Sequence, residues 1–206
     1  MSGLLFPSPS PSQGPRSGAD LDRKVAAFLE SRRGTWRDLN VPASDGRLLY
    51  ELILKNGYTR ALEIGTSTGH SAIWIAWALS KTGGKLITIE IDEGRHRQAV
   101  ENFRQAGLSD YIDARRADAH ALVRELKGPF DFVFCDAEKE GYKAYFMALY
   151  PKLEVGGCYT AHNVSNRGWG MGGGTGEFYD YIRKLPSLKT YVDESGAGLS
   201  VSYKID

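Results

Sequence analysis

A glycine-rich loop next to an acidic residue is the segment of this chain best suited to binding a cofactor. Residues 60–71 read R-A-L-E-I-G-T-S-T-G-H-S: an apolar run carries Glu63, breaks at Gly65 and Gly69, and leads into an apolar helical pattern. Glycine lets the backbone turn tightly and approach a ligand, and such turns follow the parallel strands of open α/β sheets, where ligands bind. The same glycines would also suit a purely structural turn.

Two carboxylates indicate which cofactor this loop would take. Glu90 ends the next strand-like run, 21 residues beyond Gly69, where a carboxylate can accept hydrogen bonds from both ribose hydroxyls. Glu63 would repel a pyrophosphate but favour the ammonium and sulfonium groups of S-adenosylmethionine. Because the loop also lacks the G-x-G-x-x-G spacing, the sequence favours S-adenosylmethionine over a nicotinamide dinucleotide. A nicotinamide dehydrogenase is the competing class of enzyme.

Asp118, in R-A-D-A-H, follows the third strand-like run and is placed to accept a hydrogen bond from an adenine amino group. An N-cap for the following helix explains this residue equally well.

Apolar periodicity predicts an α/β fold in which strands and helices alternate after two leading helices. The leading helices contain Leu21 to Leu29 and residues 44–55. The expected strands are 61–64, 85–90, 112–116, 130–135 and 157–161, and the expected helices are 71–79, 93–106, 119–126, 142–149 and 176–185. The runs 188–192 and 199–203 flank S-G-A-G and predict a terminal hairpin, so the sheet is expected to be mostly parallel with an antiparallel end.

Composition sets the broad class of protein. The 206 residues, 42% of them hydrophobic, suffice for a single domain over 19–206, and 26 basic against 25 acidic residues leave no footprint for nucleic acid. Cys135 and Cys158 lie in apolar runs, which favours buried thiols in a cytoplasmic protein, and no apolar run is long enough to span a membrane. Residues 1–18 are rich in Ser, Pro and Gly and are expected to form a disordered tail.

Several motifs together carry a resemblance to a known family. They are N-V-P-A-S-D-G-R-L-L at 40–49, L-E-I-G-T-S-T-G-H-S-A at 62–72, I-E-I-D at 89–92, D-A-E-K-E-G-Y at 136–142 and G-G-C-Y-T-A-H-N-V at 156–164. Their order and intervals closely resemble the catechol and caffeoyl-coenzyme A O-methyltransferases. The resemblance implies a Rossmann-like class I methyltransferase fold with a seven-stranded sheet, S-adenosylmethionine as methyl donor, a small phenolic acceptor and a homodimer.

Matched positions imply a set of cofactor contacts. Glu90 would hold the ribose, and Ala137 and Glu138 stand where relatives often carry aromatic and amide groups. The implied cofactor-binding residues are Val41, Glu63, Gly65, Ser67, Ser71, Glu90, Ile91, Asp118, Ala119 and Asp136.

The resemblance also implies the chemistry of the site. Methyl transfer from a sulfonium to a phenolate requires in-line alignment and a deprotonated acceptor. In the family a divalent metal binds two neighbouring acceptor oxygens and a lysine takes the proton. Asp136 and Lys139 match the ligating aspartate and the lysine. A surface helix start, with Asp136 as a cap, is the structural alternative.

His162 is the main departure from the family pattern. Relatives usually place Asp-Asn at the end of the fifth strand as further metal ligands, whereas this chain has His162-Asn163. The set Asp136, His162 and Asn163 would move the preference from Mg²⁺ towards Mn²⁺, Fe²⁺, Co²⁺ or Zn²⁺. The alternative hypothesis is that the site has lost its metal and that His162 acts as the general base of a metal-independent methyltransferase. A structural histidine and a non-catalytic cofactor-binding protein are further alternatives.

Residues 168–176, G-W-G-M-G-G-G-T-G, follow the strand that ends in His162. So much glycine is typical of a mobile lid, which Trp169 and Met171 would press onto an aromatic acceptor, or of a plain flexible connection. His70, His96 and His120 have no partner at metal-site spacing and are interpreted as incidental.

Overall fold

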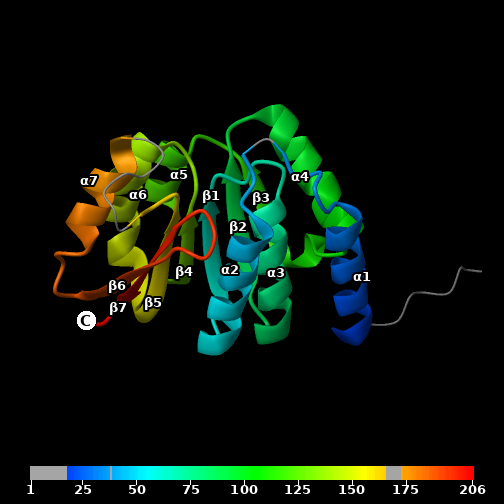
Figure 1. Ribbon diagram of the computed structural model, residues 1–206, viewed down its shortest axis with the longest axis horizontal. Helices are drawn as coiled ribbons and strands as arrows, with labels where there is room; N and C mark the ends of the chain where they lie inside the picture. The colour runs from blue at the N-terminus through cyan, green and yellow to red at the C-terminus, as the bar shows by residue number, and fades with distance from the viewer. Residues whose placement is uncertain (1–17, 38, 166–172) are drawn as a thin grey trace, which may run out of the picture.

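The computed structural model describes residues 18–37, 39–165 and 173–206 (Figure 1). Residues 1–17 of the predicted tail lie outside this description, as do Trp169 and Met171, while Gly18 already belongs to the first helix. Among the described residues, no helix is both long enough and apolar enough to cross a bilayer.

A seven-stranded sheet forms the centre of the molecule, with the strand order β3-β2-β1-β4-β5-β7-β6. Strands β1 to β5 are mutually parallel, and β7 runs antiparallel to both β5 and β6. The predicted mostly parallel α/β sheet with a terminal antiparallel hairpin is therefore confirmed. The strands are β1 Arg60–Ile64, β2 Lys85–Glu90, β3 Ile112–Arg116, β4 Phe130–Cys135, β5 Leu153–His162, β6 Leu188–Asp193 and β7 Leu199–Lys204.

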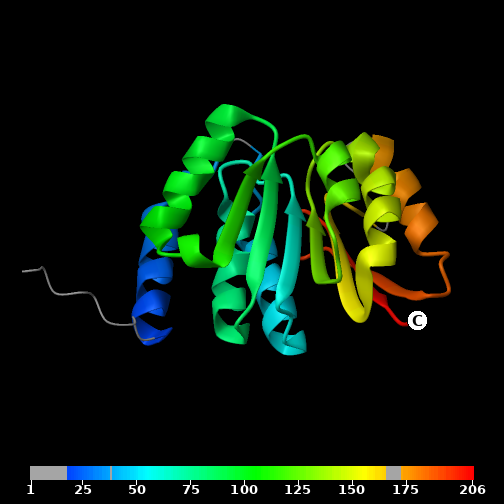
Figure 2. The same cartoon turned by 180° about the vertical axis from the view of Figure 1, so that it is seen from behind.

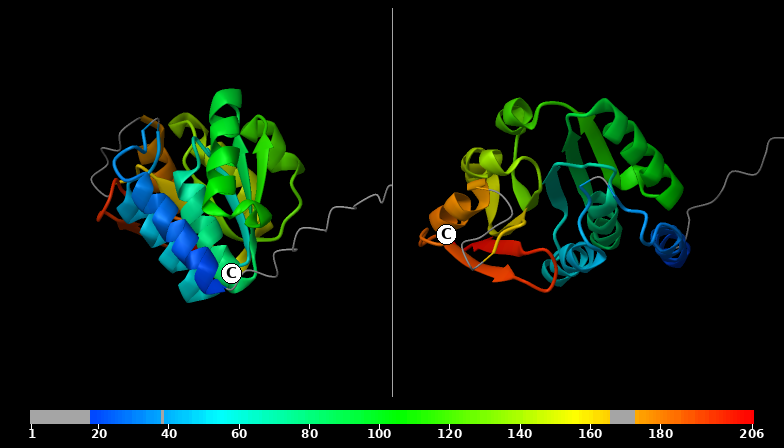
Figure 3. Two further views of the ribbon diagram at one scale, coloured as in Figure 1. Left: turned by 90° about the vertical axis from the view of Figure 1, so that its right-hand side faces the viewer. Right: turned by 45° about the horizontal axis from the view of Figure 1, so that its top comes forward.

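Helices cover both faces of this sheet, and Figures 2 and 3 show the two layers from behind, from the side and from above. One layer contains α1 to α4 and the other contains α5 to α7. The α-helices are α1 Gly18–Ser31, α2 Ala43–Asn56, α3 His70–Thr82, α4 Glu93–Ala106, α5 Ala119–Glu125, α6 Tyr142–Leu149 and α7 Gly173–Ile182. The described part of the chain also contains three short 3-10 turns: η1 Ser109–Tyr111, η2 Lys139–Gly141 and η3 Tyr150–Lys152.

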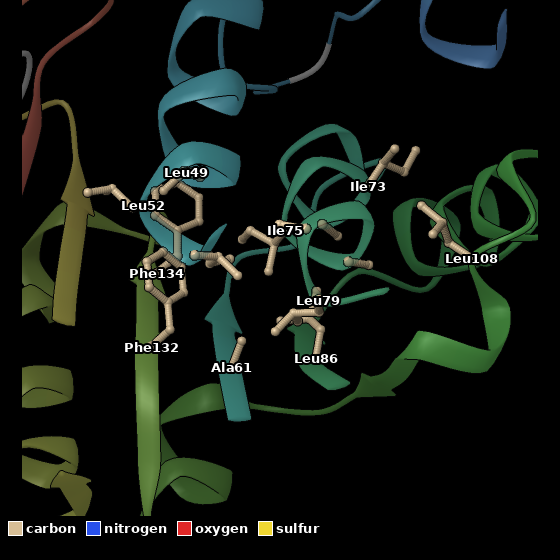
Figure 4. Close-up of a cluster of buried hydrophobic side chains, with 14 of the residues drawn as sticks. Leu49, Leu52, Ala61, Ile73, Ile75, Leu79, Leu86, Leu108, Phe132 and Phe134 are labelled. Atoms are coloured by element: carbon tan, nitrogen blue, oxygen red, sulfur yellow. The ribbon is translucent and has the colours of Figure 1, made fainter. Parts of the chain in front are cut away.

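The alternation of side chains along the strands divides the core into two clusters. Phe132 and Phe134 of β4 face α2, where Leu49 and Leu52 pack against them (Figure 4). Val133 of β4 points the other way, into the cluster formed by α5, α6 and α7. Every residue of β4 is buried, as a central parallel strand covered on both faces requires.

The predicted bounds differ most from the observed ones in β5, in α7 and at the end of α3, which is Thr82 instead of residue 79. Strand β5 begins at Leu153 instead of residue 157, because the chain is already extended before Gly156 and Gly157. Helix α7 spans Gly173–Ile182 instead of 176–185, so it includes glycines whose low helix propensity argued against a helix.

Asp131 of β4 binds the backbone at the start of β1, at the amino ends of these parallel strands. Its carboxylate accepts hydrogen bonds from the Thr59 amide at 2.7 Å, the Thr59 hydroxyl at 3.1 Å and the Arg60 amide at 2.8 Å. Because Asp131 is buried, no solvent would replace it as the acceptor for these groups.

We expect Asp131→Ala to lower the free energy of unfolding by about 3 kcal/mol, because it leaves buried backbone donors without an acceptor. Urea denaturation would measure the loss. Asp113→Ala, which removes an exposed carboxylate paired with Arg115, serves as the control and should cost no more than about 1 kcal/mol. Equal losses in the two variants would contradict this role for Asp131.

Candidate active site

A cavity of about 850 Å³ opens at the carboxyl ends of the parallel strands. It is bordered in sheet order by Asp118 after β3, Glu90 on β2, Gly65 after β1, Asp136 after β4 and His162 on β5. The predicted site residues on its wall are Gly65, Ser67, Glu90, Ile91, Asp118, Ala119, Asp136, Lys139, His162 and Asn163. Val41, Glu63 and Ser71 are buried and do not line it.

The glycine loop is held against the neighbouring strands by its backbone. Gly65 has φ of +92°, and a Cβ at this position would lie 2.4 Å from the carbonyl oxygen of Asp136. The Ser67 amide donates to Glu90 Oε2 at 2.8 Å, and the Asp92 amide donates to Oε1 at 2.9 Å. The Glu90 carboxylate thus lies at the cavity wall in a fixed orientation, at the position where the sequence predicts a ribose contact.

Glu63 lies within a buried network of hydroxyl groups. The Ser71 hydroxyl donates to one carboxyl oxygen of Glu63 at 2.5 Å. The hydroxyl of Thr88, which is the register partner of Glu63 on β2, donates to the other oxygen. Burial raises the pKa of Glu63 to about 8 against the opposing effect of these two hydrogen bonds. Without a cationic ligand, the group is therefore largely a neutral acid at pH 7, and a nearby sulfonium or ammonium group would favour its ionisation.

The segment before α2 is fastened to the glycine loop and to α3. Asn40 donates to the Thr68 hydroxyl at 2.7 Å, and the Val41 carbonyl oxygen lies 2.8 Å from His70 Nδ1. Trp74 Nε1 donates to His70 Nε2 at 3.1 Å, which fixes the neutral tautomer with the proton on Nδ1. Burial lowers the pKa of His70, consistent with that tautomer and with a structural role.

Aromatic and acidic groups line the end of the cavity beside β3. Asp118 both lines the cavity and caps α5, since its side chain accepts from the His120 amide at 2.8 Å. His120 stacks on Tyr145 with ring centroids 4.5 Å apart, and its Nε2 lies 2.7 Å from Glu138. His120, which the sequence led us to interpret as incidental, therefore lies on the cavity wall. His96 Nε2 lies 3.3 Å from the Ala114 carbonyl oxygen.

A lysine lies between an acid and a phenol after β4. Lys139 Nζ donates to Asp136 Oδ1 at 2.7 Å and to the Tyr142 hydroxyl at 2.8 Å. The Tyr142 hydroxyl in turn donates to the His162 carbonyl oxygen at 3.1 Å, and burial raises its pKa. The ammonium group therefore has a defined position at the cavity wall.

His162 lies between two carboxylates. Its Nε2 is 2.8 Å from Asp45 Oδ2 on α2, and its Nδ1 is 3.1 Å from Asp136 Oδ2. The Nδ1 contact is close enough for an ion pair but is not aligned as a hydrogen bond. Burial disfavours the charged ring, but Asp136 and Asp45 outweigh it and raise the pKa of His162 to about 9.

Sequence reasoning did not find Asp45 or the hydroxyl of Tyr142. Asp45 lies 117 residues before His162 and belongs to an amphipathic helix, where an acid in the first turn is typical of the exposed face. The only signal was the position of Asp45 inside the cofactor-covering motif at 40–49. Tyr142 is the first residue of the predicted helix 142–149, and its side chain is buried.

The sequence of this chain is similar to those of known proteins. A family model described as O-methyltransferase matches residues 23–172. A catechol O-methyltransferase from Niastella koreensis is 36% identical over 155 residues, which cover 73% of this chain and 70% of that protein. A caffeoyl-CoA O-methyltransferase from Populus kitakamiensis is 32% identical over 147 residues, which cover 69% of this chain and 62% of that protein.

Solved structures of O-methyltransferases are similar to this chain in fold. An O-methyltransferase from Bacillus cereus in complex with SAH has a TM-score of 0.76 and 25% identity, and the match covers 89% of this chain and 91% of that one. An O-methyltransferase from Streptomyces achromogenes involved in tomaymycin synthesis, in complex with SAM, has a TM-score of 0.75 at 25% identity, covering 90% and 91%.

The fold is that of a class I methyltransferase. This chain belongs to the O-methyltransferase family, which confirms the predicted class of S-adenosylmethionine-dependent O-methyltransferase.

We expect the stability of the chelator-treated protein to fall as pH rises through 9. The pKa of His162 is raised on folding, so its contribution is complete below about 6.5, the unfolded value, and is lost above 9. A shift of this size corresponds to about 3 kcal/mol. Urea denaturation at pH 6 and pH 10, on the wild type and on His162→Gln, would measure the difference, and equal pH dependence in both would contradict it.

Proposed function

We propose that this protein transfers a methyl group from S-adenosylmethionine to a hydroxyl of a small phenolic or vicinal-diol acceptor. The observation that carries the proposal is the order of groups along one cavity. Glu90 and Asp118, the proposed ribose and adenine contacts, lie at the ends of β2 and β3, and the Asp136, Lys139 and His162 cluster lies at the ends of β4 and β5. The names of the relatives from Niastella koreensis and Populus kitakamiensis support this acceptor class.

In the proposed reaction, the acceptor oxygen attacks the methyl carbon in line with the breaking carbon–sulfur bond. The new carbon–oxygen bond leaves a neutral thioether, and the hydroxyl proton leaves the acceptor. Lys139, in its neutral amine form, is the proposed proton acceptor, because Asp136 and Tyr142 hold its Nζ at the cavity wall. Glu90 would orient the cofactor through its ribose.

The donor atoms fit a divalent metal. His162 Nδ1 and Asp136 Oδ2 are 3.1 Å apart, close to the separation of about 3 Å between adjacent ligands of a six-coordinate ion with bonds of about 2.1 Å. Nδ1 has no aligned hydrogen bond, and its partner Nε2 faces a carboxylate, as in many metal-binding histidines. When bound, the ion would lower the pKa of an acceptor hydroxyl.

Asn163 would supply a third, neutral oxygen from the same wall. Within the described ranges, no three His, Cys, Asp or Glu side chains converge on one metal position, so the remaining ligands would be acceptor or water oxygens. An Asp, His and Asn set favours Mn²⁺, Co²⁺ or Zn²⁺ over Mg²⁺.

The second candidate is a metal-independent methyltransferase in which His162 is a fixed imidazolium beside the acceptor. The two flanking carboxylates favour it. A role for His162 as general base is disfavoured, because a ring with a pKa near 9 already carries its proton at neutral pH. The homodimer stays a prediction.

The test is methyl transfer to a dihydroxyphenol after exhaustive chelation, followed by Mg²⁺, Mn²⁺, Co²⁺ or Zn²⁺ restored one at a time. We expect activity to vanish and to return best with Mn²⁺, Co²⁺ or Zn²⁺, because imidazole is a poor ligand for Mg²⁺. Activity indifferent to chelation would support the metal-independent candidate. No turnover across a phenol panel, with cofactor bound, would overturn the acceptor class.

We expect Lys139→Met to lower kcat by 10²-fold or more with little change in KM, because it removes the proton acceptor and leaves the cofactor contacts in place. Lys143→Met removes an exposed amine of α6, which is paired with Glu177 of α7, and is the matched control. Steady-state kinetics at several pH values would measure both. An effect confined to KM would count against Lys139 as the base.

A further inference from the structure

Asp45 is a buried acid whose partners come from distant parts of the chain. It lies in the first turn of α2 and is only 2% exposed. Its Oδ2 is 2.8 Å from His162 Nε2 on β5 and also accepts from the Ala197 amide, in the β6–β7 connection, at 3.0 Å. The Ser44 hydroxyl lies 3.3 Å from Oδ1.

The backbone of the β6–β7 connection packs closely against this carboxylate. A Cβ on Gly196 would lie 1.4 Å from Asp45 Oδ1, so the β6–β7 connection packs directly on the acid. Hydrogen bonds from Ala197 and His162 fix the remaining oxygen. The carboxylate therefore presents one defined face to the histidine ring.

We propose that Asp45 is a positioning residue for His162, holding the proton on Nε2 and aiming Nδ1 at Asp136 so that the ring can ligate a divalent metal. The inference rests on the proposed function, because it assigns Asp45 to the same site. A carboxylate that accepts from one ring nitrogen fixes both the tautomer and the orientation of the other nitrogen.

The charge of Asp45 argues for more than an anchor for the hairpin. A neutral acceptor such as a hydroxyl or an amide would satisfy the Ala197 amide at a lower desolvation cost than a carboxylate. The carboxylate is distinguished by its ability to hold a ring proton on Nε2 when Nδ1 binds a cation.

Zn²⁺ affinity of the chelator-treated protein, measured by calorimetry, tests the proposal. We expect Asp45→Asn to weaken Zn²⁺ binding 10- to 100-fold while SAH affinity stays unchanged. Glu51→Gln, which removes an exposed carboxylate from the same helix, is the matched control and should leave both affinities unchanged. Unchanged Zn²⁺ affinity in Asp45→Asn would overturn the proposal.

A second set of variants, made in the His162→Asp protein, distinguishes a positioning role of Asp45 from a purely structural one. In His162→Asp the new carboxylate and Asp45 would repel each other, so adding Asp45→Asn to this background should strengthen Zn²⁺ binding or leave it unchanged. A purely structural Asp45 would weaken binding equally in both backgrounds, and that result would contradict the proposal. Thermal unfolding would show whether each variant folds.

Ring ¹⁵N signals of His162 provide a readout that does not require activity. In the wild type, Zn²⁺ should shift Nδ1 while Nε2 keeps its proton, and Asp45→Asn should lose this preference for one tautomer. If the wild type bound no Zn²⁺, Mn²⁺ or Co²⁺, the metal part would be overturned. The proposed methyl transfer would then still be decided separately, by the phenol assay.

Discussion

The approach of two backbones at the ends of β1 and β4 determines the geometry of the whole site. The Asp136 amide donates to the Ile64 carbonyl oxygen at 2.8 Å, and only a residue without a Cβ fits between the strands at Gly65. The strand order reverses here, since the chain proceeds to β2 and β3 on one side of β1 and from β4 to β5 on the other. Such a reversal opens a crevice outside the strand ends. The groups after β2 and β3 therefore face one half of the cavity, and those after β4 and β5 face the other.

Much of this architecture could be predicted from the sequence because it depends on local patterns. The strand Phe130–Cys135 is a continuous apolar run, and the helix Glu93–Ala106 begins at the capping Asp92 and ends before Gly107, so both were predicted with their observed bounds. The start of β5 and the start of α7 were missed because glycines interrupt the local signal where tertiary pairing decides the structure.

The cavity wall was predictable to the extent that its residues follow strands. Glu90, Asp118, Asp136 and His162 all lie where a strand ends, so the parallel sheet alone brings them to one edge. The partnership of His162 with Asp45 could not be predicted, because it joins residues 117 positions apart and depends on how α2 packs against the terminal hairpin. The burial of Glu63, which changes its expected charge, likewise becomes visible only when its neighbours are in place. Local sequence thus identified the groups, and packing determined their protonation.

The position of β7 affects the order in which parts of the sheet can pair during synthesis on the ribosome. Of the seven strands in the described sheet, β7 comes last along the chain, yet it lies between β5 and β6, so β6 has no partner in the sheet until residues 199–204 have emerged. The Ala197 amide that fixes Asp45 arrives at the same late stage. A nascent chain therefore has β1, β2 and β3 well before Asp45 and His162 can acquire all of their partners. The surroundings of Asp45 are therefore complete only after the terminal hairpin has formed.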